Sequence, residues 1–170
     1  TTIFYAGMTS EYSKIVEYRL EQNGLPLYVI GDTGTNKQTK AKKFAGMQKN
    51  VAIVGDVFYE AGLERKNDSK FVTHFYRYFN RTENTYIMIG NHDVATVGSP
   101  QRIKRQAKKF PNIHFPNHYY AFVYKDVCLM FLDTNVYKGS VAKKMWKFVD
   151  EFVEDEKCDG KPKIAMGHHP

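Results

Sequence analysis

Four polar side chains follow directly on short apolar runs, and each comes after a glycine. The runs end in "VIGD", "IVGD", "MIGN" and "AMGH", so the polar residues are Asp32, Asp56, Asn91 and His168. Carboxylate, amide and imidazole donors together suit manganese, iron or zinc, whereas calcium prefers oxygen alone. Two carboxylates held together without a cation repel each other and raise each other's pKa. The four residues therefore predict a site for transition-metal ions.

Helix capping is the alternative for any one of these junctions, because Asp and Asn are common N-cap residues. Ser and Thr are favoured caps as well, yet none of the four junctions uses them. The preceding glycine lets the backbone bend without a side-chain clash. Four junctions of the same kind favour one shared site over four unrelated caps.

The elements that must position these residues alternate along the chain from residue 27 onward. We expect strands at residues 27–32, 51–56 and 85–90, and helices at about 38–47, 69–79 and 99–110. Alternating strands and helices, with strands apolar throughout, are typical of a parallel sheet in an α/β fold. The carboxyl ends of parallel strands lie at one edge, where ligands bind. We therefore expect all four polar residues at the same edge.

Turn and capping signals add detail. The run 119–134 predicts a hairpin that turns near Lys125 and Asp126. Ser99 is expected to cap the helix over 99–110, with Pro100 at its first position.

The last part of the chain predicts a helix over 140–156 with Ser140 as its N-cap, then a short strand before His168. Residues 1–26 fit the alternation less well and predict either a strand with a helix or an N-terminal extension. The division is thus an extension at 1–26 and a domain at 27–170.

Composition limits the class of protein. The chain has 170 residues, of which 42% are hydrophobic and 25% charged, so we expect a globular domain rather than a disordered one. No apolar run approaches the roughly 20 residues needed to span a bilayer. The net charge of +7 favours anionic partners. The lysine-rich stretches 35–44 and 101–110 are interpreted as solvated helix faces, and no nucleic-acid partner is expected.

Two features bear on the compartment. Cys128 lies in an apolar run and Cys158 in a polar one; one disulfide is possible but cannot be deduced. Asn67 and Asn80 begin triplets of the N-glycosylation pattern. The triplets favour, weakly, a secreted protein or an endomembrane, lysosome-like compartment.

The series "GDTG", "GDVFY", "GNHD" and "AMGHHP" resembles the calcineurin-like metallophosphoesterases, and more narrowly their purple acid phosphatase branch. Most of the superfamily has D-x-H at the first motif, but Gly34 stands where that His would be. Tyr59 is expected to supply a hard anionic oxygen in its place, which suits ferric iron; the alternative is a packed aromatic side chain. The resemblance implies a four-layer α/β/β/α sandwich, of which this chain is the N-terminal half. A missing C-terminal portion or a second chain would complete the site.

The resemblance also implies roles for individual residues. Asp32 and Tyr59 would bind Fe(III), Asp56 would bridge both ions, and Asn91 and His168 would bind a divalent iron, zinc or manganese ion.

His92 would be the catalytic residue, which protonates the leaving group or binds the phosphoryl oxygens. Asp93 would either orient His92 or cap the next helix, and His169 would face substrate or solvent.

The expected reaction is that of an acid phosphatase, in which a metal-bound hydroxide attacks a phosphate monoester. One alternative is a catalytically inactive scaffold or binding protein of the same family. Another is a related phosphodiesterase, although Gly34 argues against it because those branches use D-x-H.

Overall fold

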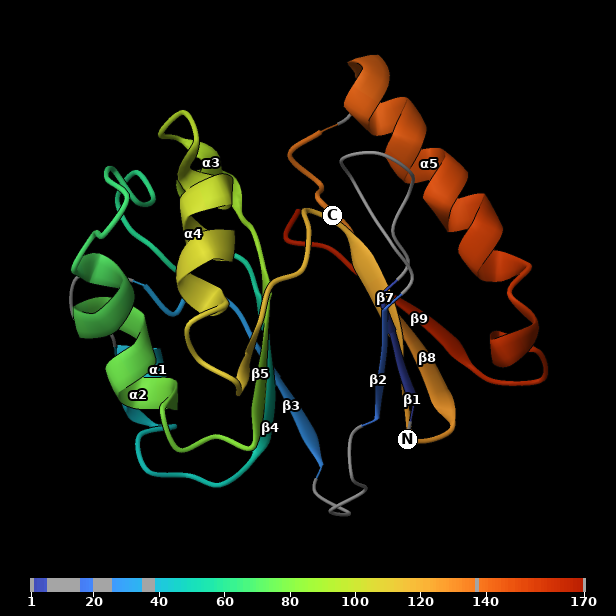
Figure 1. Ribbon diagram of the computed structural model, residues 1–170, viewed down its shortest axis with the longest axis horizontal. Coiled ribbons are helices and arrows are strands. Elements are labelled where there is room, and N and C mark those ends of the chain that lie inside the picture. The colour runs from blue at the N-terminus through green and yellow to red at the C-terminus, as the bar shows by residue number, and fades with distance from the viewer. Residues whose placement is uncertain (1, 6–15, 20–25, 35–38, 137, 170) are drawn as a thin grey trace. The chain divides into compact units, whose positions relative to one another are not determined.

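The computed structural model describes residues 2–5, 16–19, 26–34, 39–136 and 138–169 (Figure 1). The chain divides into two compact units. The parallel-sheet unit comprises residues 25–115 and 168–170, and the mixed-sheet unit comprises residues 1–24 and 116–167.

The parallel-sheet unit is built on a four-stranded sheet with the order β3-β4-β5-β6, in which all neighbours are parallel. Its strands are β3 (Leu27–Ile30), β4 (Asn50–Val54), β5 (Asn84–Met88) and β6 (Ile113–His114). The central strands β4 and β5 are buried almost throughout, which explains why their sequences read as continuous apolar runs. The predicted parallel α/β sheet is confirmed.

The helices of this unit are α1 (Thr39–Lys42), the π-helix η1 (Phe71–Tyr76), α2 (Arg77–Phe79), α3 (Asn91–Val94) and α4 (Ser99–Ala107). The segment from η1 through α2 buries Phe71, Phe75 and Phe79, at the spacing of one helix face. The helix predicted over 38–47 is wrong in length. Only α1 is helical there, turns follow it from residue 43, and residues 35–38 lie outside the described part of the chain.

Ser99 is not the N-cap of α4. Gly98 holds that position with a left-handed φ of 77°, Ser99 begins the helix, and Pro100 is its second residue. The Ser99 hydroxyl instead accepts a hydrogen bond from the backbone N–H of Leu63, at 2.9 Å. The distant partner outcompetes the local capping bond that the sequence suggested.

The mixed-sheet unit contains the predicted hairpin of β7 (Tyr120–Tyr124) and β8 (Val127–Phe131), which turns at Lys125 and Asp126. The last strand, β9 (Lys163–Met166), pairs in parallel with β8. His168 therefore follows a strand of this sheet, so the expectation that all four polar residues end strands of one sheet is wrong. Pairing is a long-range property that the apolar pattern of β9 does not encode.

Helix α5 (Gly139–Val153) and the 3-10 helix η2 (Glu156–Cys158) connect β8 with β9. The predicted cap Ser140 lies inside α5, because the helix begins one residue earlier and Lys138 is its N-cap.

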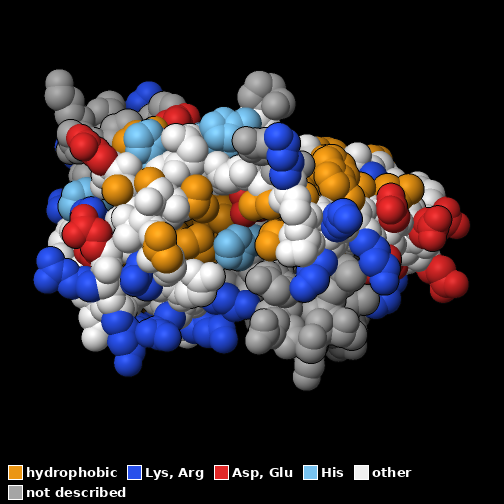
Figure 2. All heavy atoms as spheres, turned by 90° about the horizontal axis from the view of Figure 1, so that it is seen from above, with side chains coloured by type: hydrophobic (Ala, Val, Ile, Leu, Met, Phe, Trp, Pro, Cys, Tyr) orange, Lys and Arg blue, Asp and Glu red, His pale blue; other side chains and the backbone are white. Residues whose placement is uncertain are grey.

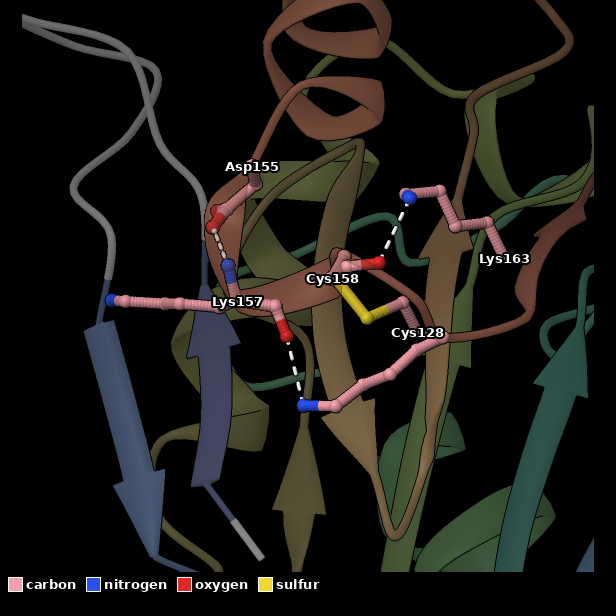
Figure 3. Close-up of a disulfide and its surroundings, with 6 residues drawn as sticks. Cys128, Asp155, Lys157, Cys158 and Lys163 are labelled. Atoms are coloured by element: carbon pink, nitrogen blue, oxygen red, sulfur yellow. Dashed lines mark hydrogen bonds between the residues drawn. A yellow bond between two sulfur atoms is a disulfide. The ribbon is translucent and has the colours of Figure 1, made fainter.

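A disulfide joins Cys128, in β8, to Cys158, at the end of η2 (Figure 3). From the sequence this disulfide was possible but could not be deduced, and the structure contains it. A crosslink that closes a loop of this size stabilises a fold by about 3–4 kcal/mol. It fixes the chain that leaves α5 to the sheet on which α5 packs.

The chain's first residues form an antiparallel pair of strands, β1 (Thr2–Tyr5) and β2 (Val16–Arg19), with β1 beside β7. Residues 6–15 and 20–25 of the predicted extension lie outside the described residues. In the described part of the chain, no helix is both long and apolar enough to cross a bilayer.

Candidate metal centre

Two tight turns at the carboxyl ends of β3 and β4 present Asp32 and Asp56. Both residues have left-handed backbones, with φ of 53° and 56°, a conformation that non-glycine residues seldom adopt. The turns are tied together because Asp32 N donates to Gly55 O at 3.1 Å and Gly34 N donates to Asp56 O at 3.0 Å. This backbone pairing holds both carboxylates over the same edge of the sheet.

His168 brings a nitrogen to these carboxylates within the same unit. Its ring and the carboxylates of Asp32 and Asp56 offer three ligand atoms that all lie within 4.8 Å of one another. Its Nδ1 lies 2.9 Å from the Val54 carbonyl oxygen, so in a neutral ring Nδ1 carries the proton. The lone pair of Nε2 then faces Asn91 Oδ1 at 3.2 Å and Asp56 Oδ2 at 3.4 Å. Because a neutral Nε2 has no hydrogen to donate to these two oxygens, the three atoms fit a bound cation.

A missing side chain allows this close approach. A Cβ at residue 90 would overlap the Asp56 carboxylate and crowd the His168 ring. Gly90 therefore leaves room for the acceptors to meet. The sequence had suggested only a bending role for the glycine at this junction.

Tyr59 completes the carboxylate group. Its hydroxyl donates to Asp56 Oδ2 at 2.7 Å and to Asp32 Oδ1 at 3.2 Å. Burial raises the pKa of Tyr59, and the hydrogen bond and charge of Asp56 and then of Asp32 raise it further. Without a strongly acidic cation the phenol therefore keeps its proton.

Gly34 has a steric reason to lack a side chain. A Cβ at this position would overlap the backbone carbonyl of Val57. The main chain that leads to Tyr59 thus occupies the space where a histidine at residue 34 would begin. The absence of a side chain at residue 34 therefore has a steric cause.

His92 lies beside Tyr59 and is half-buried. Its backbone N–H donates to Asp56 Oδ1 at 3.1 Å, and its ring centroid lies 4.2 Å from that of Tyr59. Its Nδ1 contacts the Glu60 carbonyl oxygen. His169 is exposed, and its ring lies 4.7 Å from that of His168.

Asp93 is fully buried. Of the two roles considered from the sequence, orienting His92 or capping the next helix, the structure shows the capping role. Its carboxylate accepts from Gly90 N at 2.9 Å, from Phe58 N at 2.8 Å and from Val57 N at 3.0 Å. Burial raises the pKa of Asp93 to about 6, although the three backbone donors lower it. Asp93 therefore joins the loop of Tyr59 to the loop of His92.

Two further residues, which the sequence did not indicate, join the chain after Tyr59 to α4. Ser99 accepts from Leu63 N, as described above, and Arg102 donates to Leu63 O at 3.1 Å and to Val97 O at 2.7 Å. Leu63 is 36 residues from Ser99 and 39 from Arg102, so no local motif marks these two contacts.

Two histidines outside this group have partners elsewhere in the protein. His114 contacts Asn84 Oδ1 at 2.8 Å, and His118 contacts Asp133 Oδ2 at 3.0 Å.

Residues 25–170 match the calcineurin-like phosphoesterase family, Metallophos. The chain belongs to this metallophosphoesterase family. A search of curated proteins found no match to it. Family membership makes the chain a hydrolase of phosphoesters by class, and members typically bind two metal ions. The group of Asp32, Asp56 and His168 is thus a candidate metal site of this metallophosphoesterase.

Proposed function

We propose that this metallophosphoesterase is an acid phosphatase of the purple acid phosphatase type, which hydrolyses phosphate monoesters with Fe(III) and a divalent ion. One observation carries the proposal. The Tyr59 hydroxyl lies between Asp32 and Asp56, at the place where the backbone at Gly34 leaves no room for a histidine.

The donor set suggests how two different ions are held. Asp32 and Tyr59 offer hard anionic oxygens to Fe(III), and the two oxygens of Asp56 allow it to serve both ions. Asn91 and His168 offer an amide oxygen and an imidazole nitrogen, which suit divalent iron, zinc or manganese. When bound, such a pair supplies an activated water and neutralises the charge that develops on the phosphoryl group.

The residues beside the ions handle the substrate. His92 is held through its backbone by Asp56 and through Nδ1 by Glu60. Its Nε2 is then free to donate a hydrogen bond to a phosphoryl oxygen, or a proton to the alkoxide that leaves as the P–O bond breaks. His169 is exposed next to His168 and is proposed to face the substrate. The buried carboxylate of Asp93 holds the loops of Tyr59 and His92 together.

The compartment is part of the proposal. Disulfides persist in oxidising compartments, and Cys128 and Cys158 form one. Asn67 and Asn80 are exposed and begin glycosylation triplets. Both features support a secreted or endomembrane, lysosome-like location.

The test compares a monoester with a diester. The chain, loaded with iron and zinc, is assayed against p-nitrophenyl phosphate and bis(p-nitrophenyl) phosphate. We expect a preference for the monoester and a loss of about 100-fold or more in kcat for His92→Ala, the scale of general acid catalysis. His74→Ala, a histidine on η1 whose ring contacts Thr73, is the matched control and should leave kcat unchanged. Faster turnover of the diester would make the protein a phosphodiesterase instead.

A further inference from the structure

Helix α5 carries two faces that differ in kind. Its inner face buries Ala142, Met145, Phe148 and Phe152. On the outer side, Trp146 is 56% exposed and Val153 is 55% exposed. Seven residues make about two helical turns, so these two apolar side chains lie on the same flank. A large exposed tryptophan paired with a second apolar residue is a feature that the packing of α5 does not explain.

The charges on the outer side are segregated. Lys143, Lys144 and Lys147 lie toward the start of α5, and Asp150, Glu151 and Glu154 lie toward its end. The first turn has no acidic residue and the last turn has no basic one. A helix dipole favours the opposite order, by about 0.3–1 kcal/mol for each charge. The arrangement therefore opposes the helix dipole, and within the helix Lys147 Nζ lies 3.6 Å from Glu151 Oε1, four residues further on.

We infer that α5 binds a second copy of this chain through its outer face, with the two helices antiparallel about a two-fold axis. In this arrangement Lys143 and Lys147 of one copy face Glu154 and Asp150 of the other. Trp146 of one copy then packs near Val153 of its partner. Because the axis is two-fold, every contact occurs twice.

Charge balance favours this occupant over others. The outer side has three cations in one half and three anions in the other. In an antiparallel dimer, the basic half of each copy therefore faces the acidic half of its partner. A nucleic acid or an anionic membrane would be attracted by the lysine half and repelled by the acidic half. Figure 2 shows Lys and Arg side chains next to Asp and Glu side chains at the right-hand end of the view.

The helix is also held ready for such a contact. Its inner face packs on the hydrophobic cluster of β7 and β8, which includes Ala121 and Met130. Beyond its end, Cys158 is bonded to Cys128, and Lys163 Nζ donates to Cys158 O at 2.8 Å (Figure 3). A preordered helix loses little freedom on association, which favours binding through a small surface.

Sedimentation velocity across a wide range of protein concentration tests the inference. We expect a reversible dimer whose Kd rises at least about tenfold in Trp146→Ala, which corresponds to about 1.4 kcal/mol. Val72→Ala, a 46% exposed valine on η1, is the matched control and should leave the Kd unchanged.

Charge reversal makes the test specific. The double variants Lys143→Glu/Lys147→Glu and Asp150→Lys/Glu154→Lys should each fail to dimerise alone, because like charges then face each other. Mixed in equal amounts, they should form a heterodimer. A chain that stays monomeric throughout, or a dimer that is indifferent to Trp146→Ala and to both reversals, would overturn the inference.

Discussion

The two ends of the parallel sheet are both polar, but they are built in different ways. At the amino ends of the strands, Asn84 Nδ2 donates to Asn50 Oδ1 at 3.1 Å, and Asn84 Oδ1 meets His114 Nε2 at 2.8 Å. At the carboxyl ends, the lone pair of His168 meets oxygens of Asn91 and Asp56. The amino end pairs donors with acceptors and is complete. The carboxyl end gathers acceptors, which makes it a candidate site for a cation.

This difference distinguishes polar groups that pair with one another within the protein from polar groups that favour a bound ligand. A polar network with all its partners inside the protein adds specificity to the fold and needs no ligand. A group of acceptors that meet one another is costly until a positive charge joins them. The parallel-sheet unit has the first kind at one end of its sheet and the second kind at the other.

The largest expected effect is at the carboxyl end. Asp56→Asn should abolish binding of the metal pair and reduce kcat on the order of 1,000-fold, the scale of removing a group that stabilises the transition state. The substitution removes the charge at the centre of the acceptors. Metal content by mass spectrometry and turnover of a monoester measure it.

Asp68→Asn is the matched control, because Asp68 is also a buried carboxylate but accepts from Glu64 N and Lys70 N in a separate turn. It should retain its metal. Equal metal loss in both variants would mean that a general loss of stability, rather than a change in the metal site, causes the effect.

The next effect concerns the crowding behind Tyr59. Gly34→Ala should lower the free energy of unfolding by about 3 kcal/mol, because the added Cβ overlaps the Val57 carbonyl. Gly46→Ala, where the Cβ meets open space, should cost only the roughly 1–2 kcal/mol of its left-handed backbone. Urea unfolding measures both. If Gly34→Ala is no worse than Gly46→Ala, the carboxyl end is less tightly packed than the structure shows.

The amino end should respond in stability alone. Asn84→Ala leaves Asn50 and His114 without their shared partner, so we expect a loss of about 2 kcal/mol in the free energy of unfolding. Metal content and KM should not change. A drop in metal content would mean that the two ends are coupled.

The smallest expected effect is a dependence of stability on pH. Burial lowers the pKa of His114 to about 4. The unfolded chain binds a proton at this residue below about pH 6.5, whereas the folded chain does not until near pH 4. Stability is therefore full above pH 6.5 and falls as the pH drops, by about 1 kcal/mol between pH 7 and pH 5.5. His114→Gln should flatten this part of the profile in urea unfolding, and an unchanged slope would assign it to other groups.

Local signals predicted much of this fold and site. The positions of Asp32, Asp56 and Asn91 followed from glycine and a polar residue after apolar runs, because strand ends are encoded within a few residues. The closeness of Tyr59 to Asp32 and Asp56 was also expected, from two motifs considered together, whereas its replacement of a histidine ligand stays a prediction.

What the sequence did not predict depends on contacts between distant segments. The sheet to which the strand before His168 belongs is set by pairing with β8, and the bond from Leu63 to Ser99 crosses 36 residues. The disulfide joins residues 30 apart, on opposite sides of α5 in the sequence. No local pattern encodes these partners.

The most direct test of the central claim is the visible absorption spectrum of the iron-loaded chain and of its Tyr59→Phe variant. A phenolate bound to Fe(III) gives a violet charge-transfer band, so we expect the band in the native chain and its loss in the variant. Tyr76→Phe, a change at a tyrosine that stacks on Phe110, should keep the colour. A band that survives Tyr59→Phe, or a native chain that binds iron without colour, would contradict the account.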